Sequence, residues 1–214
     1  MNPLRDLIRF AFHQFYNRFA FTYDTVSAIV SRNEWRAWTR AAIPFLRGTR
    51  ILEIAFGTGN LHLDLYAAGY KPYGIDLSPY MHEITARKFR SRNLMPQLAR
   101  ADVCALPFPS DFFSTLVMTF PPGFVFNPLA MREMYRVLEP RGVLVWVDAA
   151  YLEPDAWWAR VINRAFQVTG TSAPASARTG ALEAAQRAGA NWTWQVETVR
   201  TRASRVQVFL ARKA

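Results

Sequence analysis

One segment, in which a strand, a turn, a helix and a second strand follow one another, constrains the fold of this chain more than any other feature. Residues 50–55 carry the apolar run Ile-Leu-Glu-Ile, which is typical of a strand buried in a parallel sheet. A turn with two glycines over residues 56–60 then opens a helix that we expect to end near Gly69, and a second strand over 72–75 stops at Asp76. Ligands bind beyond the carboxyl ends of parallel strands that are joined in this way, so the turn and the aspartate mark an expected binding crevice.

Strands and helices keep alternating through the middle of the chain. Ser78-Pro79 and Asn127-Pro128 are good helix starts, because Ser and Asn accept backbone hydrogen bonds at an N-cap and proline fits the first helical position. Further strands are expected over residues 97–101, 115–120 and 143–147. The alternation predicts an α/β protein with a Rossmann-like, doubly wound and mostly parallel sheet.

The two ends of the chain differ from this alternation. Apolar residues recur at helical spacing over residues 4–46, which predicts an N-terminal helical cap. After the last parallel strand we expect a helix over 151–168, a linker over 169–179, a helix over 180–188, and strands over 192–201 and 205–212. The last two strands are close enough in sequence to pair as an antiparallel C-terminal hairpin.

The cysteine and histidine content excludes two kinds of structural support. Cys104 is the only cysteine, so no internal disulfide framework can form, and a cytoplasmic location is expected. The three histidines are not spaced as a ligand set, so no metal site is predicted. Charged residues interrupt the apolar parts of the first thirty residues, and we therefore expect neither a signal peptide nor a membrane-spanning run of about 20 residues.

The net charge of +10 at pH 7 has three interpretations: a nucleic-acid binder, a protein attracted to anionic lipid, or simply a basic proteome. Lys and Arg are spread along the chain rather than gathered in runs, and no compact nucleic-acid-binding motif is present. A nucleic-acid partner is therefore not expected.

The glycine turn discriminates between classes of nucleotide ligand. A pyrophosphate-binding turn has the pattern G-x-G-x-x-G, whereas this turn reads E-x-A-x-G-x-G, with His62 in place of the third glycine and no P-loop lysine. A carboxylate at Glu53 suits a ligand without phosphate, above all one that carries an ammonium group. The turn thus favours a nucleoside whose ribose hydroxyls donate to Asp76.

Four segments, in order along the chain, resemble the motifs of class I S-adenosylmethionine-dependent methyltransferases. They are Ile51 to Gly59, Gly74 to Met81, Ala101 to Phe108, and Arg136 to Gly142. The resemblance implies S-adenosylmethionine as cofactor, with Asp76 on the ribose, Met81 against the adenine, and Asp102 and the Val103 amide at the edge of that ring. The full set of implied cofactor residues is Tyr23, Glu53, Ala55, Gly57, Gly59, Asn60, Asp76, Leu77, Met81, Asp102, Val103 and Thr119.

The sequence departs from this family at two glycine positions. Ala55 stands where the family usually has its first glycine, which adds a methyl group beside the methionine moiety, and Arg141 replaces another common glycine on the surface side. The resemblance divides the chain into an N-terminal helical cap over residues 1–48 and an S-adenosylmethionine-binding methyltransferase domain over 49–214. The predicted C-terminal hairpin fits the family as well, because its final strand is antiparallel.

The N-terminal segment is similar to that of the ubiquinone/menaquinone-biosynthesis C-methyltransferases. The similarity covers residues 16–24, Ser31 and residues 35–38. It implies that Tyr23 lies over the methionine end of the cofactor and that Arg36 helps to close the pocket. An amphipathic cap held by aromatic packing explains the same residues equally well.

Methyl transfer from a sulfonium is an in-line displacement in which the protein aligns the reacting groups and excludes water. It needs no metal, and it needs a general base only if the acceptor atom arrives protonated. His13, Tyr16 and Tyr23 are weak candidates for that role, while His62 and His82 are predicted to be packing or surface residues.

Residues 119–126 lie where this family shapes its acceptor site, and they are apolar and aromatic. They lack the Asn/Asp-Pro-Pro-Tyr sequence that binds an amino group, so we predict C- or O-methylation of a small lipophilic or aromatic acceptor. Trp157 and Trp158 belong to a further aromatic helix, either a lid or an ordinary core helix. Together with the Arg-flanked N-terminal helix, it suggests peripheral contact with a membrane.

Two other classes of function stay open at this point. One is a catalytically silent cofactor-binding protein on the same fold, which applies if the Ala55 methyl blocks the cofactor. The other is a tRNA or rRNA methyltransferase, which only the net charge favours.

Overall fold

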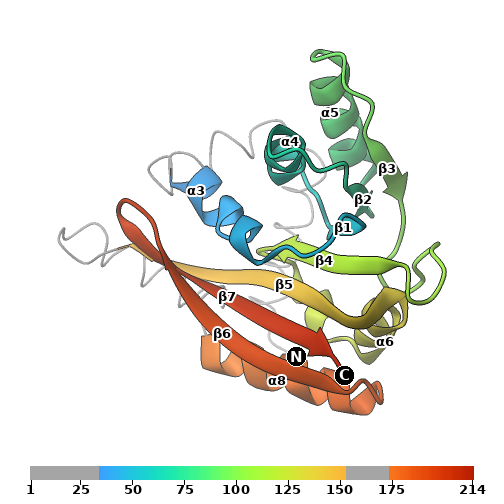
Figure 1. Ribbon diagram of the computed structural model, residues 1–214, viewed down its shortest axis with the longest axis vertical. Coiled ribbons are helices and arrows are strands. Elements are labelled where there is room, and N and C mark those ends of the chain that lie inside the picture. The colour runs from blue at the N-terminus through green and yellow to red at the C-terminus, as the bar shows by residue number, and fades with distance from the viewer. Residues whose placement is uncertain (1–33, 153–173) are drawn as a thin grey trace, which may run out of the picture.

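The structure is a computed structural model that describes residues 34–152 and 174–214 (Figure 1). Its centre is a seven-stranded sheet in the order β3-β2-β1-β4-β5-β7-β6. The strands are β1 (Ile51–Ile54), β2 (Tyr73–Asp76), β3 (Gln97–Arg100), β4 (Phe113–Thr119), β5 (Leu138–Leu152), β6 (Trp192–Arg200) and β7 (Ser204–Lys213). The first five strands pair in parallel, and β7 is antiparallel to both of its neighbours. The predicted Rossmann-like sheet with an antiparallel C-terminal hairpin strand is confirmed.

Helices cover both faces of this sheet. They are α3 (Trp35–Arg40), η2 (Ile43–Phe45), α4 (Asn60–Ala67), α5 (Pro79–Arg90), η3 (Gly123–Phe126), α6 (Pro128–Val137) and α8 (Pro174–Arg187). On one face α6 and α8 share a core with Trp146 of β5, and on the other face α3 and α4 share a core with Val145 and Val147 of the same strand. Because β1 and β4 are enclosed from both sides, consecutive residues of these strands are buried, rather than every second one.

The two predicted N-caps are confirmed. The Ser78 hydroxyl accepts a hydrogen bond from the Met81 amide at 3.4 Å, and the Asn127 side-chain oxygen accepts one from the Leu129 amide at 3.0 Å. A proline occupies the first turn of each helix. These caps start α5 and α6 immediately after the loops that follow β2 and β4, so they fix where those loops end.

Two predicted boundaries are wrong. The fifth strand continues to Leu152, so Tyr151 is not helical, because β7 pairs with β5 as far as Leu152 opposite Ser204. The predicted linker is helical from Pro174 onward, since proline suits a first helical turn and the alanines that follow favour a helix. Tertiary pairing and helix propensity thus outweigh the local turn signal of the small residues.

Some of the predicted elements lie partly or wholly outside the residues that the structure describes. The helices expected over residues 4–33 and 153–168, with Trp157 and Trp158, lie outside the described residues. Within the predicted cap the structure describes α3 and η2, and the division at residue 48 stays a prediction. In the segments 34–152 and 174–214, none of the helices has the length and apolar character needed to span a bilayer.

Candidate functional site

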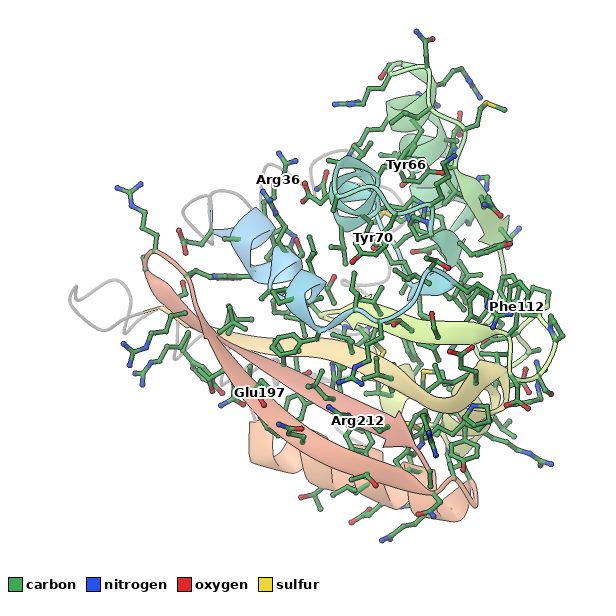
Figure 2. All side chains as sticks on the ribbon, viewed as in Figure 1. Arg36, Tyr66, Tyr70, Phe112, Glu197 and Arg212 are labelled. Carbon is green, nitrogen blue, oxygen red and sulfur yellow. The ribbon has the colours of Figure 1, made fainter. Side chains whose placement is uncertain are left out.

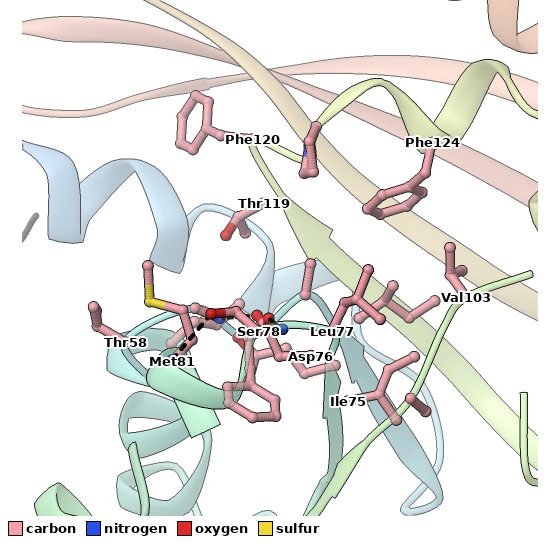
Figure 3. Close-up of a pocket in the computed structure, with 18 of the residues that line it drawn as sticks. Thr58, Ile75, Asp76, Leu77, Ser78, Met81, Val103, Thr119, Phe120 and Phe124 are labelled. Atoms are coloured by element: carbon pink, nitrogen blue, oxygen red, sulfur yellow. Dashed lines mark hydrogen bonds between the residues drawn. The ribbon is translucent and has the colours of Figure 1, made fainter. Parts of the chain in front are cut away.

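A cavity of about 580 Å³ opens where β1, β2 and β4 end, at the carboxyl edge of the sheet (Figure 3). Its walls come from segments that are far apart in sequence: α3, the turn after β1, the loop after β2, the loop after β3 and the loop after β4. The crossover topology brings these loops together, since the carboxyl ends of neighbouring parallel strands lie at one edge.

Nearly all of the predicted cofactor residues that the structure describes line this cavity. They are Glu53, Ala55, Gly57, Asn60, Asp76, Leu77, Met81, Asp102, Val103 and Thr119. Gly59 lies beside the cavity and is buried, and Tyr23 is outside the described residues. The structure therefore assembles the predicted set in one place, and the binding role of each residue stays a prediction.

Gly59 serves the shape of the turn rather than the wall of the cavity. Its φ is +73°, and a Cβ at this position would lie 2.4 Å from the Thr85 methyl of α5. The Thr85 hydroxyl donates a hydrogen bond to the Gly57 carbonyl oxygen at 2.9 Å. Only glycine allows this close approach, and the approach holds the turn against α5.

Two residues without glycine's freedom adopt left-handed backbone conformations at the cavity. Ala55 has a φ of +57° and Phe120 a φ of +47°. A left-handed conformation costs about 1–2 kcal/mol for a residue with a Cβ, and such strain is concentrated at functional sites. The Phe120 amide donates to the Val147 carbonyl at 2.7 Å, which ties this strained position to β5.

Asp76 is the carboxylate at the centre of the cavity floor. Its Oδ2 accepts the Gly57 amide at 2.8 Å and its Oδ1 accepts the Ser78 amide at 2.8 Å. Burial raises the pKa of Asp76, and the hydrogen bonds from Ser78 and Gly57 oppose that shift. A carboxylate has about four lone-pair positions, so each oxygen can accept one more hydrogen bond, as a ribose diol requires.

The walls beside Asp76 suit a flat apolar ring with a polar edge. Met81 is buried under the cavity, while Leu77 is 61% exposed at its rim. Asp102 accepts the Cys104 amide at 2.9 Å through Oδ1, which orients its carboxylate next to Val103. The adenine position that the resemblance implies at these residues stays a prediction.

Glu53 and His62 form a buried pair that sequence reasoning missed. Nδ1 of His62 lies 2.7 Å from Oε2 of Glu53, and the two residues are 0% and 2% exposed, respectively. The prediction of His62 as a packing or surface residue overlooked this partner. The only sequence signal was the spacing, which places His62 on the inner face of the helix that follows the glycine turn.

Arg36 lies outside the cavity wall, and the pocket-closing role that the resemblance implies for it stays a prediction. Its guanidinium pairs with the buried Asp64 carboxylate of α4, with Nε 3.1 Å from both carboxylate oxygens, and it does not line the cavity. Figure 2 shows Arg36 between α3 and α4. An unpaired carboxylate as buried as Asp64 would be costly, so the arginine is held there and joins the cap to the sheet domain.

The side of the cavity opposite Met81 and Ser78 is aromatic (Figure 3). Phe120 and Phe124 contribute from the loop after β4, and Trp35 from α3. Trp35 stacks on Phe120, with ring centroids 4.6 Å apart and an interplanar angle of 28°. The apolar and aromatic character expected for residues 119–126 is present on this wall, to which α3 adds Trp35, and its role in binding an acceptor stays a prediction.

The candidate bases His13, Tyr16 and Tyr23 all lie outside the described residues. In the described part of the chain, no group of three His, Cys, Asp or Glu side chains is arranged to hold a metal ion. The chemistry that the described walls can offer is hydrogen bonding by carboxylates on one side and apolar packing on the other.

Asp148 is an ionisable group near the site that sequence reasoning also missed. It follows Val147 at the irregularity in the pairing of β5 with β7. Burial raises the pKa of Asp148 to about 6. This carboxyl therefore changes charge in the physiological range, next to the strand position that anchors Phe120.

The chain is similar in sequence to known methyltransferases. Residues 51–142 match the family described as "Methyltransferase domain". The chain is 36% identical over 132 residues to the demethylmenaquinone methyltransferase of Thermus thermophilus, covering 59% of this chain and 60% of that protein. It is 30% identical over 135 residues to the ubiquinone/menaquinone biosynthesis C-methyltransferase UbiE of Pectobacterium carotovorum, covering 59% and 54%. The chain thus spans less than two thirds of the length of these curated relatives.

Solved structures share the fold. One is a SAM-dependent methyltransferase from Thermotoga maritima, described as a possible histamine N-methyltransferase, with a TM-score of 0.62, 19% identity and coverage of 94% of this chain and 99% of that one. At this level of identity the likeness establishes the fold alone.

The strain at Ala55 yields a testable prediction. Ala55→Gly should leave the free energy of unfolding equal to that of the parent or raise it by up to about 1 kcal/mol, because relief of the left-handed strain exceeds the entropic cost of glycine. Ala55→Val should lower it by about 2 kcal/mol or more, since a β-branched residue is a severe outlier at positive φ. Urea unfolding measures both, and a valine variant as stable as the glycine variant would contradict the left-handed assignment.

The buried Asp148 predicts a pH dependence of stability. An acid whose pKa is higher in the folded than in the unfolded state destabilises the fold as it ionises, so this contribution lowers the free energy of unfolding as the pH rises from about 4 through about 6. Asp148→Asn removes this destabilising contribution. As the pH rises from 4 to 8, the free energy of unfolding of the variant should therefore increase by about 1–3 kcal/mol relative to that of the parent. Urea unfolding at several pH values tests this, with Asp111→Asn as an exposed control, and parallel curves for parent and Asp148→Asn would refute it.

Proposed function

We propose that the chain is a class I S-adenosylmethionine-dependent methyltransferase, near the ubiquinone/menaquinone-biosynthesis type, that transfers a methyl group from S-adenosylmethionine to a small, planar and apolar acceptor. One observation carries the proposal: residues from four separate loops, each predicted to contact the donor, converge on one cavity around Asp76. The opposite wall of that cavity is aromatic.

The donor half of the cavity fits an adenosine with an amino-acid tail. Asp76 would accept both ribose hydroxyls, because its amide hydrogen bonds leave one lone pair on each oxygen facing the ligand. Met81 and Leu77 would enclose the adenine, with Asp102 and Val103 at its edge. Glu53, Ala55 and Gly57 would lie at the methionine end. When bound, the cofactor supplies an electrophilic methyl group on a positively charged sulfur.

The acceptor half fits a flat ring. Trp35, Phe120 and Phe124 offer an apolar surface with few hydrogen-bonding groups, which favours an aromatic acceptor over a sugar or an amino acid. Demethylmenaquinone, the compound in the name of the Thermus relative, is an acceptor of this kind. We propose C- or O-methylation of such a ring, with the strained Phe120 holding it in line with the donor.

The residues of this chain would contribute alignment and exclusion of water. The carboxylates fix the donor, the aromatic wall fixes the acceptor plane, and burial between them keeps water away from the reacting methyl group. If the acceptor oxygen or carbon arrives protonated, His13, Tyr16 and Tyr23 of the N-terminal cap are the proposed proton acceptors. In this proposal residues 1–48 form the cap and residues 49–214 the S-adenosylmethionine-binding domain.

Removal of the central carboxylate tests the donor site. Asp76→Ala should weaken binding of S-adenosylmethionine and S-adenosylhomocysteine by at least about tenfold, or 1.4 kcal/mol, because the ribose hydroxyls lose their acceptor. Calorimetric titration measures the affinity, and Asp111→Ala, which removes an exposed carboxylate at the other end of β4, should bind as the parent does.

A parent protein that binds neither compound would contradict the proposal. Binding without methyl transfer to any quinol or phenol would favour the non-catalytic cofactor-binding protein instead. Retention on tRNA or rRNA that weakens steeply with salt would favour the nucleic-acid methyltransferase.

We also propose that the protein acts in the cytoplasm at the surface of a membrane. The net charge of +10, the Arg-flanked apolar N-terminal sequence and a lipophilic acceptor support this placement. The full chain should sediment with vesicles that contain phosphatidylglycerol, should not sediment with pure phosphatidylcholine, and should be released at high salt. Equal recovery in the supernatant with both kinds of vesicle would count against membrane contact.

A further inference from the structure

A buried carboxylate and imidazole pair lies behind the wall of the cavity. Glu53 lines the cavity, whereas His62 of α4 does not. The imidazole Nδ1 lies 2.7 Å from the carboxylate Oε2. Glu53 in the cavity wall is therefore connected to His62 behind it.

The surroundings of His62 decide which ring nitrogen carries the proton. A neutral imidazole has one N–H; here Nδ1 faces the carboxylate, and Nε2 has no hydrogen-bond partner among the residues that the structure describes. The rings of Phe56, Tyr66 and Phe89 lie 5.4–6.2 Å from the imidazole, centroid to centroid. A proton on Nε2 would be buried without an acceptor, at a cost of about 1–3 kcal/mol. The proton is therefore on Nδ1, and the imidazole donates to Glu53.

Gly74 of β2 leaves space for the imidazole ring of His62. Gly74 of β2 pairs with Glu53 of β1, and a Cβ on Gly74 would lie 3.0 Å from Cε1 of His62 and 2.9 Å from the Phe56 ring. The absence of a side chain on the neighbouring strand thus lets the imidazole approach the carboxylate. The position of the ring is set by the packing of three elements, β1, β2 and α4.

Burial and this hydrogen bond act in opposite directions on the pKa of Glu53. Burial raises the pKa of Glu53, the nearby carboxylates of Asp76 and Asp64 add to that shift, and the hydrogen bond from His62 opposes it. Arg36 neutralises Asp64 through its ion pair. Other titratable groups on the surrounding helices are Tyr66 of α4 and His82 of α5. The imidazole is the one group in this set that donates a hydrogen bond to the Glu53 carboxylate.

We propose that His62 is a positioning residue for the cofactor: its Nδ1–H orients the Glu53 carboxylate, so that Oε1 accepts a hydrogen bond from the ammonium group of the ligand's amino-acid end. His62 acts only through Glu53 and does not touch the ligand. The inference rests on the proposed function and deepens it, since it assigns the recognition of the amino-acid end to a pair rather than to one acidic residue.

Two nucleosides separate this role from a purely structural one. S-adenosylhomocysteine carries the amino-acid end, and 5′-methylthioadenosine has the same adenosine and thioether without it. His62→Phe should weaken binding of S-adenosylhomocysteine by at least about tenfold, while binding of 5′-methylthioadenosine stays within about threefold of the parent. Glu53→Gln should show the same pattern. His62→Gln, whose amide can still donate to Glu53, should recover most of the loss.

Tyr66→Phe is the matched control, because it changes a ring beside His62 without touching Glu53, and it should leave both affinities unchanged. Equal losses for the two nucleosides in His62→Phe, or no loss in either, would overturn the inference and leave the donor site standing. A parent that binds neither nucleoside would overturn the donor site, and this inference with it.

A second measurement needs no ligand. The chain has three histidines, so nitrogen-15 spectra of the parent can be assigned by comparison with His62→Gln. His62 should show the Nδ1–H tautomer at neutral pH. The Nε2–H tautomer, which leaves no donor toward Glu53, would overturn the inference even if the binding data agreed with it.

Discussion

The Asp76 carboxylate connects the two loops on which the whole site depends. It ends β2, and through two amide hydrogen bonds it joins the turn after β1 at Gly57 to the start of α5 at Ser78. The same turn is held from the other side by Thr85 of α5. Because α5 carries Met81 as well, one carboxylate fixes the relative positions of the floor, the turn and the apolar wall of the cavity. The residues that line this part of the cavity are thereby preorganised.

The other half of the cavity depends on aromatic packing and on a strained backbone position that a hydrogen bond holds in place. Phe120 keeps an unfavourable backbone conformation because its amide is bonded to β5 and its ring is stacked on Trp35. The ion pair of Arg36 with Asp64 holds α3, and with it Trp35, against α4. Through Trp35, α3 thus contributes directly to the aromatic wall of the cavity.

Sequence reasoning succeeded where the signal was local and failed where it was a contact between distant elements. The glycine turn, the aspartate after β2 and the capped helix starts follow from the chemistry of a few adjacent residues, and the structure assembles them as expected. The Arg36 partner was missed because Asp64 lies on another helix, 28 residues away. The extension of β5 was missed because only β7, more than fifty residues later, provides its hydrogen bonds. His62 was assigned to packing because the carboxylate beside it lies on a neighbouring strand.

The sequence by itself determined the order of strands and helices along the chain, the glycine turn after β1 and the identity of the carboxylates, because these depend on hydrophobic period, backbone freedom and side-chain chemistry at fixed spacing. Tertiary structure decided which of those groups face the cavity, how deeply they are buried and which neighbours they contact. Burial of Glu53 against an imidazole, the left-handed conformations of Ala55 and Phe120, and the stacking of Trp35 arise only when strands and helices pack. Desolvation and close packing act on neighbours in space, and a chain position does not reveal those neighbours.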